Sequence, residues 1–188
     1  CTLKDGRKIT ADLVFVCFGD KPNSAPLVNS SSSNVSRVKL DHRRCVEVDA
    51  TLRVKNLENV FCCGDVATPP TEGVKQAYHA EVQGHLAAGN VIRLNRGEKL
   101  LHYPQDAAMG SDFMPMVYVL SLGKSDGVIG FNGLAIPGPL AAVLKWIIEW
   151  TKVRQMLGRP IGILVWMIGD TVAFFISKYL LPPLQKID

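Results

Sequence analysis

The residues whose types and spacing could do chemistry gather in one stretch, NVFCCGDVATPPTEGVKQAYHAEVQGH, residues 59–85. A short buried strand is predicted to stop at Gly64-Asp65, and a helix is predicted to start near Val74 after a Pro-rich loop. In open α/β sheets, ligands bind just beyond the carboxyl ends of the strands. A carboxylate there can accept hydrogen bonds from sugar hydroxyls, and the helix start offers unpaired N–H groups. The stretch therefore favours a nucleotide site, with an ordinary Asp turn as the alternative.

A second strand of the same kind lies about 45 residues upstream, in LVFVCFGDKPNSAPL. Residues 13–18 form an apolar run without alternation, which is typical of a strand covered on both faces. The run ends at Gly19 and is followed by Pro22-Asn23 in a loop. Two glycine-terminated strands at this spacing favour the nucleotide site over the simple turn.

Other reactive side chains show weaker patterns. The five cysteines are odd in number and contain no C-x-x-C, which favours reduced thiols over a disulfide framework. Cys62 and Cys63 are adjacent on a strand and point to opposite faces, so we interpret both as packing residues. His79, Glu81 and His85 share a helix but do not converge as metal ligands would, and we expect them to be exposed. We predict no metal site and identify no catalytic residue.

Composition sets broad limits on the molecule. The chain has 188 residues and a net charge of +4, carried by scattered basic residues. This charge is too small and too dispersed to indicate a nucleic-acid partner, and suits weak attraction to an anionic membrane surface. The sequence opens at Cys1 in what reads as the middle of a sheet, so we expect it to be the C-terminal part of something longer.

The remaining elements follow from turn residues and periodicity. Asp5-Gly6 predicts a hairpin turn, and residues 45–54 alternate as exposed hairpin strands would. A helix is predicted from about residue 74 to 94, and residues 114–136 read as a hairpin. Residues 139–156 are predicted to be helical, and residues 161–181 are apolar for most of their length, with Asp170 in the middle. The predicted core face of the first helix is Ala77, Ala80, Leu86 and Val91.

The order of these motifs resembles the pyridine nucleotide-disulfide oxidoreductase superfamily. In that family a strand ending in Gly and Pro-Asn re-enters the FAD domain, and a later strand ending in Gly-Asp reaches the flavin. NVFCCGDVATPPTEGVKQAYHAEVQGHLAAGNVIRL and the hairpin MVYVLSLGKSDGVIGFNG are similar to the apoptosis-inducing-factor-like group within it. The resemblance covers residues 12–133, and the last 50 residues only loosely.

The resemblance implies a cofactor site. Asp65 would bind the ribityl hydroxyls of FAD, and Gly64 and Val66 would approach the cofactor through their backbone. Lys75, Gln76 and Ala77 would lie at the helix start beside the isoalloxazine, where the positive end of the helix dipole would stabilise the charge of the reduced flavin. The remaining two implied residues, near the ribityl–pyrophosphate region, are Gly19 and Asp20.

The implied fold is α/β. Residues 1–104 would hold the end of the NAD(P)H-binding domain and the C-terminal half of a Rossmann-like FAD-binding domain. Residues 105–188 would form a small α+β domain with a hairpin and apolar helices. The glycine-rich fingerprints of both dinucleotide domains would lie upstream, so we expect this fragment not to hold FAD tightly or to turn over alone.

The function that the resemblance implies is an FAD-dependent NAD(P)H oxidoreductase that reduces a quinone-type acceptor. Residues 139–188 could dock on a membrane, pack on the protein body or a second subunit, or span the bilayer, and Asp170 makes spanning costly. The protein would be cytoplasmic and peripheral on a membrane, with a mitochondrial location also open. The alternatives are a non-enzymatic anchored protein that keeps the fold, and a disulfide reductase, which would need an upstream cysteine pair.

Overall fold

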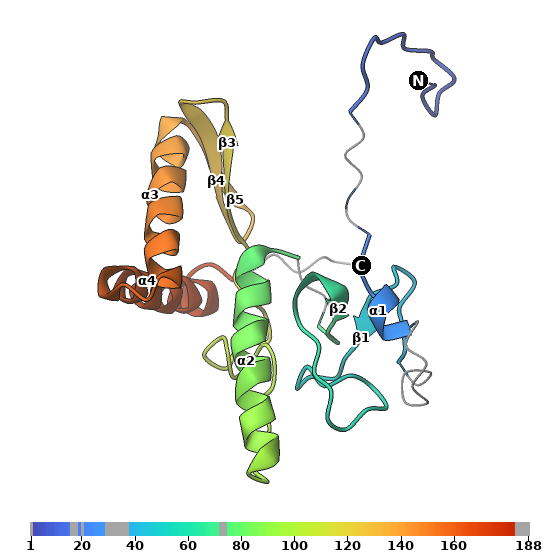
Figure 1. Cartoon of the computed structure of the whole chain (residues 1–188). Coiled ribbons are helices and arrows are strands. Elements are labelled where there is room, and N and C mark those ends of the chain that lie inside the picture. The colour runs from blue at the N-terminus through green and yellow to red at the C-terminus, as the bar shows by residue number, and fades with distance from the viewer. Residues whose placement is uncertain (1, 16–18, 20, 29–37, 72–74, 183–188) are drawn as a thin grey trace.

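The computed structural model describes residues 2–15, 19, 21–28, 38–71 and 75–182 of the chain. These residues form a mixed α/β structure with two small sheets (Figure 1). The short helix α1 covers Ala25–Val28, and β1 (Val46–Glu47) pairs in parallel with β2 (Ala67–Thr68). The second sheet is antiparallel and contains β3 (Val117–Leu122), β4 (Asp126–Phe131) and β5 (Leu134–Pro137), in that order.

The N-terminal residues lead away from the rest of the chain (Figure 1). The predicted hairpin turn is confirmed: Gly6 has φ +83°, and the N–H of Leu3 donates to the carbonyl of Arg7 at 2.9 Å. The buried strand expected at residues 13–18 is wrong for residues 13–15, which belong to no strand and include Phe15 at 81% exposure. Among the described residues no neighbouring strand pairs with this segment. The apolar side chains of residues 13–15 are therefore exposed in the described part of the chain. Residues 16–18 lie outside the described part.

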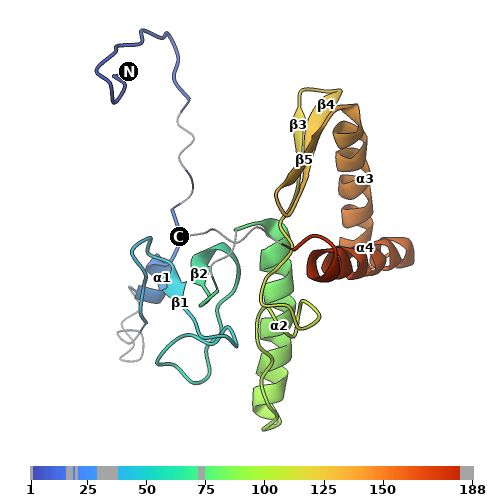
Figure 2. The ribbon, with the colours of Figure 1, turned by 180° about the vertical axis from the view of Figure 1, so that it is seen from behind.

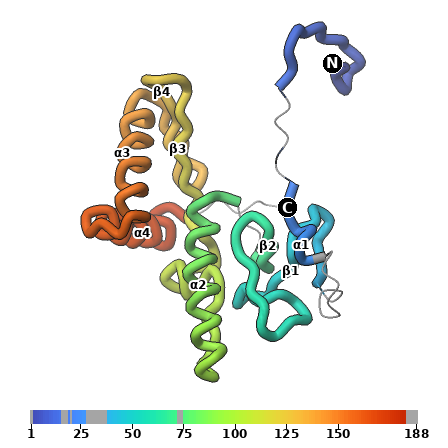
Figure 3. The backbone as a smooth tube through the Cα atoms, in the orientation of Figure 1, coloured from blue at the N-terminus to red at the C-terminus, as the bar shows by residue number. Residues whose placement is uncertain are grey.

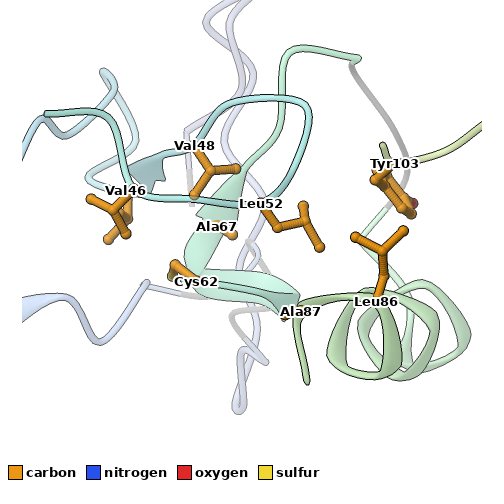
Figure 4. Packing of buried hydrophobic residues seen from close by; sticks show 9 residues of the cluster. Val46, Val48, Leu52, Cys62, Ala67, Leu86, Ala87 and Tyr103 are labelled. Carbon is orange, nitrogen blue, oxygen red and sulfur yellow. The ribbon is translucent and has the colours of Figure 1, made fainter. Parts of the chain in front are cut away.

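The hydrophobic core surrounds β1 and β2 and reaches across to the long helix that follows them (Figure 4). Residues 45–54 were expected to be exposed hairpin strands, but their apolar side chains are buried. The most deeply buried are Val46, Val48, Leu52 and Val54. Isolated bridges from Leu40 to Val46 and from Val48 to Val54 fold this segment into turns rather than long strands. The expectation of exposed strands is therefore wrong for this segment.

Helix α2 runs over Ala77–Asn95. It ends where Gly97 adopts φ +68° and Glu98 N–H donates to Arg93 O at 2.9 Å, which is the hydrogen-bonded stop that glycine permits. Its buried face differs from the predicted one, since Ala77 and Val91 are exposed. The buried residues of the helix are His79, Gln83, Leu86, Ala87 and Asn90. Three of these five are polar, and assigning the core from apolar residues alone missed them.

The second sheet confirms the predicted hairpin and adds a third strand. Asn132-Gly133 joins β4 to β5, and both residues have positive φ, which the tightest hairpin turns require. The side-chain Nδ2 of Asn132 also donates to Ser177 Oγ at 2.9 Å, and its Oδ1 accepts from Met116 N–H at 2.8 Å. This buried amide ties the sheet to the last helix.

Two helices complete the chain. Helix α3 covers Pro139–Met156, the predicted range, and packs on β3 and β4. Helix α4 covers Pro160–Tyr179 and lies across the end of α3, as Figures 2 and 3 show from opposite sides. The two helices approach closely at Gly162, where an added Cβ would come within 2.3 Å of Gln155 N.

Contacts connect α2 to these C-terminal elements. Lys152 of α3 forms an ion pair with Glu81 of α2, and Nε2 of His79 lies 3.2 Å from the carbonyl of Pro115. His79 was expected to be exposed, and this expectation is wrong because the segment before β3 covers it. The division of the chain into domains 1–104 and 105–188 stays a prediction.

Candidate functional site

The candidate site lies where the segment of Phe61, Cys62 and Cys63 ends. Gly64 adopts φ +75° and starts a single 3-10 turn, Gly64–Val66, which leads directly into β2. Asp65 is the exposed residue of this turn. The short buried strand expected to end at Gly64-Asp65 is wrong: residues 59–63 form no strand, and only Phe61 makes an isolated bridge, to Arg53. The backbone instead changes direction at Gly64 and presents Asp65 at the surface.

Gly64 also lies close to helix α2. An added Cβ there would come 3.5 Å from Ala80 Cβ, and the N–H of Gly64 donates to Gln83 Oε1 at 2.8 Å. A side chain at position 64 would be strained by the positive φ as well. The turn that carries Asp65 is therefore held against the first half of α2.

Lys75 folds back onto the same turn from just before α2. Its Nζ donates to the carbonyl of Asp65, to the carbonyl of Ala67 at 3.2 Å, and to Cys45 Sγ at 3.0 Å. These contacts bind the start of α2 to the end of the turn. They also place a cation on the turn that carries Asp65, at the backbone carbonyl of that residue.

The helix start has donors to offer. Gln76 is the N-cap residue, with extended backbone and no side-chain cap hydrogen bond. The first N–H groups of a helix have no partner within it, and those of Ala77 and Tyr78 fall in this class. In the part of the chain that the structure describes, Gln76 Oε1 is buried without a hydrogen-bond partner. An orphaned buried acceptor and unpaired donors at one helix end fit a polar ligand such as a dinucleotide.

The structure brings most, but not all, of the predicted site residues together. Six of them lie on the turn or at the start of α2: Gly64, Asp65, Val66, Lys75, Gln76 and Ala77. Gly19 has φ +65°, and a side chain added there would meet nothing within 4 Å. Asp20 lies outside the described residues. The contribution of each of these residues to binding a cofactor stays a prediction.

Sequence reasoning missed two supporting residues. Gln83 holds Gly64, and Cys45 accepts from Lys75, yet neither carries a recognisable motif. Helical spacing offered one signal, because positions 79, 83, 86, 87 and 90 lie on one face of a helix. A polar side chain on such a face indicates a partner that the sequence does not name.

The cysteines behave as packing residues within the described part of the chain. Cys62 belongs to the hydrophobic core, and burial raises the pKa of its thiol to about 11. A thiol with this pKa stays protonated and unreactive at neutral pH. Among the described residues no group of three or more His, Cys, Asp and Glu side chains could hold a metal ion.

The chain is similar to known redox proteins. The sequence model of the pyridine nucleotide-disulphide oxidoreductase family matches residues 1–84. An "FAD-dependent oxidoreductase FVFD30" of Flammulina velutipes is 33% identical over 147 residues, which are 77% of this chain and 41% of the relative. Ferroptosis suppressor protein 1 of Xenopus tropicalis is 33% identical over 130 residues, 69% of this chain and 31% of the relative.

A bacterial relative extends the match further along the chain. A soluble pyridine nucleotide transhydrogenase of Pseudomonas paraeruginosa is 38% identical over 162 residues, 86% of this chain and 31% of the relative. The chain thus spans less than half the length of each of these curated relatives. The family match covers the N-terminal 84 residues, including the turn that carries Asp65 and the first part of α2.

Proposed function

We propose that this chain comes from an FAD-dependent enzyme that takes electrons from NAD(P)H, because the sequence model of the pyridine nucleotide-disulphide oxidoreductase family matches residues 1–84. FAD and NAD(P)H are the cofactors that this family and the oxidoreductase and transhydrogenase relatives imply. When bound, FAD would supply the redox chemistry between the nicotinamide and an acceptor, which protein side chains alone cannot supply. We further propose a quinone-type molecule as the acceptor.

The chain's own residues would bind and orient the flavin. Asp65 would accept hydrogen bonds from the ribityl hydroxyls, and the missing side chain of Gly64 would let the backbone come close. Lys75 and the first N–H groups of α2 would stabilise negative charge at the far end of the ring system. The observation that supports this best is the hydrogen bond from Lys75 Nζ to the backbone carbonyl of Asp65, which holds the turn of Asp65 and the segment before α2 together.

The C-terminal helices support a peripheral place on a membrane. Helix α4 is long and apolar enough to cross a bilayer. Its apolar stretch has a mean hydropathy of 1.7, and only 11% of that stretch is buried within the structure. Burial raises the pKa of Asp170 in its middle, with Lys152 opposing and Glu81 adding to the rise. Asp170 on one side of α4 therefore interacts with Lys152 of α3 and Glu81 of α2. These charges favour docking of α4 along the membrane surface over spanning. We place the protein on the cytoplasmic side, where its thiols stay reduced; a mitochondrial membrane is the alternative.

Anaerobic mixing tests the proposed activity. The whole protein, purified with its flavin, is mixed first with NADH or NADPH and then with a soluble ubiquinone analogue while the flavin absorbance is followed. We expect one nicotinamide to bleach the flavin within a second or so, the time scale of an ordinary turnover, and the quinone to restore the colour. A flavin that no nicotinamide bleaches would contradict the proposal and favour a non-enzymatic anchored protein. Bleaching without recovery on quinone addition would contradict the acceptor alone.

A further inference from the structure

A surface hollow of about 640 Å³ lies where α3 ends and α4 begins. It is built from the last turn of α3, the connection, and the first turn of α4. The residues that line it are Val153, Arg154, Leu157, Arg159, Pro160 and Ile161. Two of the six carry a permanent positive charge and the other four are apolar.

The backbone fixes the spacing of the two arginines. Gly158 adopts φ +68°, its N–H donates to Gln155 O at 2.9 Å, and the N–H of Arg159 donates to Arg154 O at 2.9 Å. This hydrogen-bond pair ends a helix in the way that glycine allows, and it usually brings two apolar side chains together at these positions. Here both positions hold arginine. The helix stop therefore places two like charges where an apolar contact is normal.

Arg159 is unfavourably placed for helix stability. It is the N-cap residue of α4, a position that prefers Ser, Thr, Asp or Asn and where the positive end of the helix dipole disfavours a cation. No side-chain cap hydrogen bond forms, and within the described residues its guanidinium has no ion-pair partner. Arginine at this position lowers the stability of the helix. A ligand that binds through the positive charge of Arg159 accounts for its presence there.

Arg154 is held in place beside it. Its guanidinium carbon lies 3.4 Å from the centre of the Trp150 ring, and its Nη1 lies 3.4 Å from the carbonyl of Trp150. Stacking of this kind fixes the plane of the guanidinium while leaving donors free. The close approach at Gly162 also makes the helix corner rigid, so the hollow is preformed.

The surface around the hollow is strongly apolar. Met156 is 81% exposed and Leu157 69% exposed, and Ile161 is half-exposed at the start of α4. Helix α4 then continues with exposed Leu164 and Ile168. A phosphate ion needs the arginines but not this apolar border. A phospholipid needs both, because its phosphate meets the guanidinium groups while its acyl chains cover the apolar side chains.

We propose that this hollow, formed by Arg154 and Arg159, binds the phosphate headgroup of an anionic phospholipid. The inference rests on the proposed membrane docking and adds to it a defined headgroup site and a lipid preference. Together with the apolar face of α4, the site would set the depth and the orientation of α4 in the interface.

Sedimentation with vesicles tests the site on the whole protein. Vesicles of phosphatidylcholine alone are compared with vesicles that also contain phosphatidylserine, at fixed ionic strength. We expect the wild type to prefer the anionic vesicles and the variant Arg154→Gln/Arg159→Gln to bind them about 30-fold more weakly, since each basic residue near such a surface contributes about 1 kcal/mol. The matched control, Arg96→Gln/Lys99→Gln, loses the same charge at the far end of α2 and should lose less than about threefold.

The other possible results of the vesicle experiment also decide for or against the proposal. Equal loss in the two double variants would show general charge attraction and overturn the site, as would unchanged binding of Arg154→Gln/Arg159→Gln. Release of the protein by inorganic phosphate at the same ionic strength would assign the hollow to a small anion instead of a lipid. Absence of binding to every vesicle would overturn the docking proposal too, while the flavin bleaching assay would still report separately on the redox activity. The single variant Arg159→Gln, on an exposed side chain, guards against misfolding and should show a partial loss.

Discussion

At the scale of single residues, Asp41 shows how a carboxylate can stabilise the region around the site. Its Oδ2 accepts from the hydroxyl of Thr68 at 2.7 Å, and its Oδ1 accepts from the N–H groups of Arg43 and Cys45, both at 2.8 Å. Burial opposes ionisation, but these hydrogen bonds together lower the pKa of Asp41 below its ordinary value of 3.8. Asp41 thus connects β2 to the turn before β1, next to the thiol that Lys75 contacts.

This arrangement predicts a pH dependence of stability. A carboxyl with a lowered folded-state pKa contributes stability above its ordinary pKa and loses that contribution as the pH falls through the folded-state value. We expect Asp41→Asn to lower the free energy of unfolding by about 1–2 kcal/mol at neutral pH, because hydrogen bonds to a charged acceptor become neutral ones. Urea unfolding at several pH values measures the difference, which should shrink in acid. A pH-independent difference would contradict this assignment, and exposed Glu58→Gln should have little effect.

The role of a residue could be predicted from the sequence only where the residue belongs to a recognisable motif. Asp65 was identified from the Gly-Asp pair that precedes a helix, although the strand expected before this pair does not form. Gln83 and Asn90 were not identified, because polar side chains rank as exposed in any hydrophobic pattern. Each is buried only because a backbone group from a distant segment hydrogen-bonds it, and one sequence does not show which segment that is.

At the scale of elements, one amide joins α2 to two other segments of the chain. Asn90 is fully buried; its Nδ2 donates to the carbonyls of Thr51 and Leu101, each at 2.9 Å, and its Oδ1 accepts from Leu101 N–H at 2.8 Å. The two segments that flank the core are therefore joined to the same side of the helix. Removing the amide would take the partner from one buried and two partly buried backbone groups.

We expect Asn90→Ala to lower the free energy of unfolding by about 2–4 kcal/mol, because unsatisfied buried polar groups are costly. Asn95→Ala is the matched control: it makes the same substitution at an exposed position of the same helix and should change stability by less than about 0.5 kcal/mol. Chemical denaturation followed by circular dichroism measures both. Equal effects of the two variants would show that the Asn90 hydrogen bonds add nothing.

The elements were predictable to different degrees for physical reasons. The range 139–156 was correct because Pro139 marks a helix start and Gly158 a stop, both of which are local signals. The hairpin was correct because its turn residues are local as well. The strand at residues 13–18 was wrong for residues 13–15, since a strand needs neighbours, and no described segment supplies them. The pattern of apolar residues along the sequence does not show which other segment covers them.

At the scale of the whole molecule, the chain exposes much apolar surface along α3 and α4. Exposed large side chains include Trp146, Met156 and Met167, each more than half accessible. Contiguous apolar surface of this extent marks an interaction site in a water-soluble protein. The α/β class was expected from two glycine-terminated strands, but neither residues 13–15 nor residues 59–63 form a strand. The sheets that make the described structure α/β are β1–β2 and β3–β4–β5, whose number and size were not predicted.

Two charges on α4 test whether this surface meets a membrane. Leu164 and Ile168 are exposed one turn apart, so Leu164→Glu/Ile168→Glu should leave the fold intact while placing carboxylates in the interface. We expect the variant to move from the membrane pellet to the supernatant by at least about tenfold, given the cost of inserting charged groups. Val91→Glu, on exposed surface of α2, is the control and should stay in the pellet. Retention of the α4 variant would contradict docking through this helix.

The proposed function depends most on the carboxylate of Asp65 binding a flavin. The flavin content of the whole protein, measured from its visible absorbance per polypeptide after purification, tests this claim directly. We predict that Asp65→Ala loses most of its flavin, about tenfold or more in affinity, because several hydrogen bonds to a charged acceptor disappear together. Asp112→Ala, at an exposed carboxylate away from the turn, should keep the wild-type content. Full flavin occupancy in Asp65→Ala would contradict the proposed role of this turn.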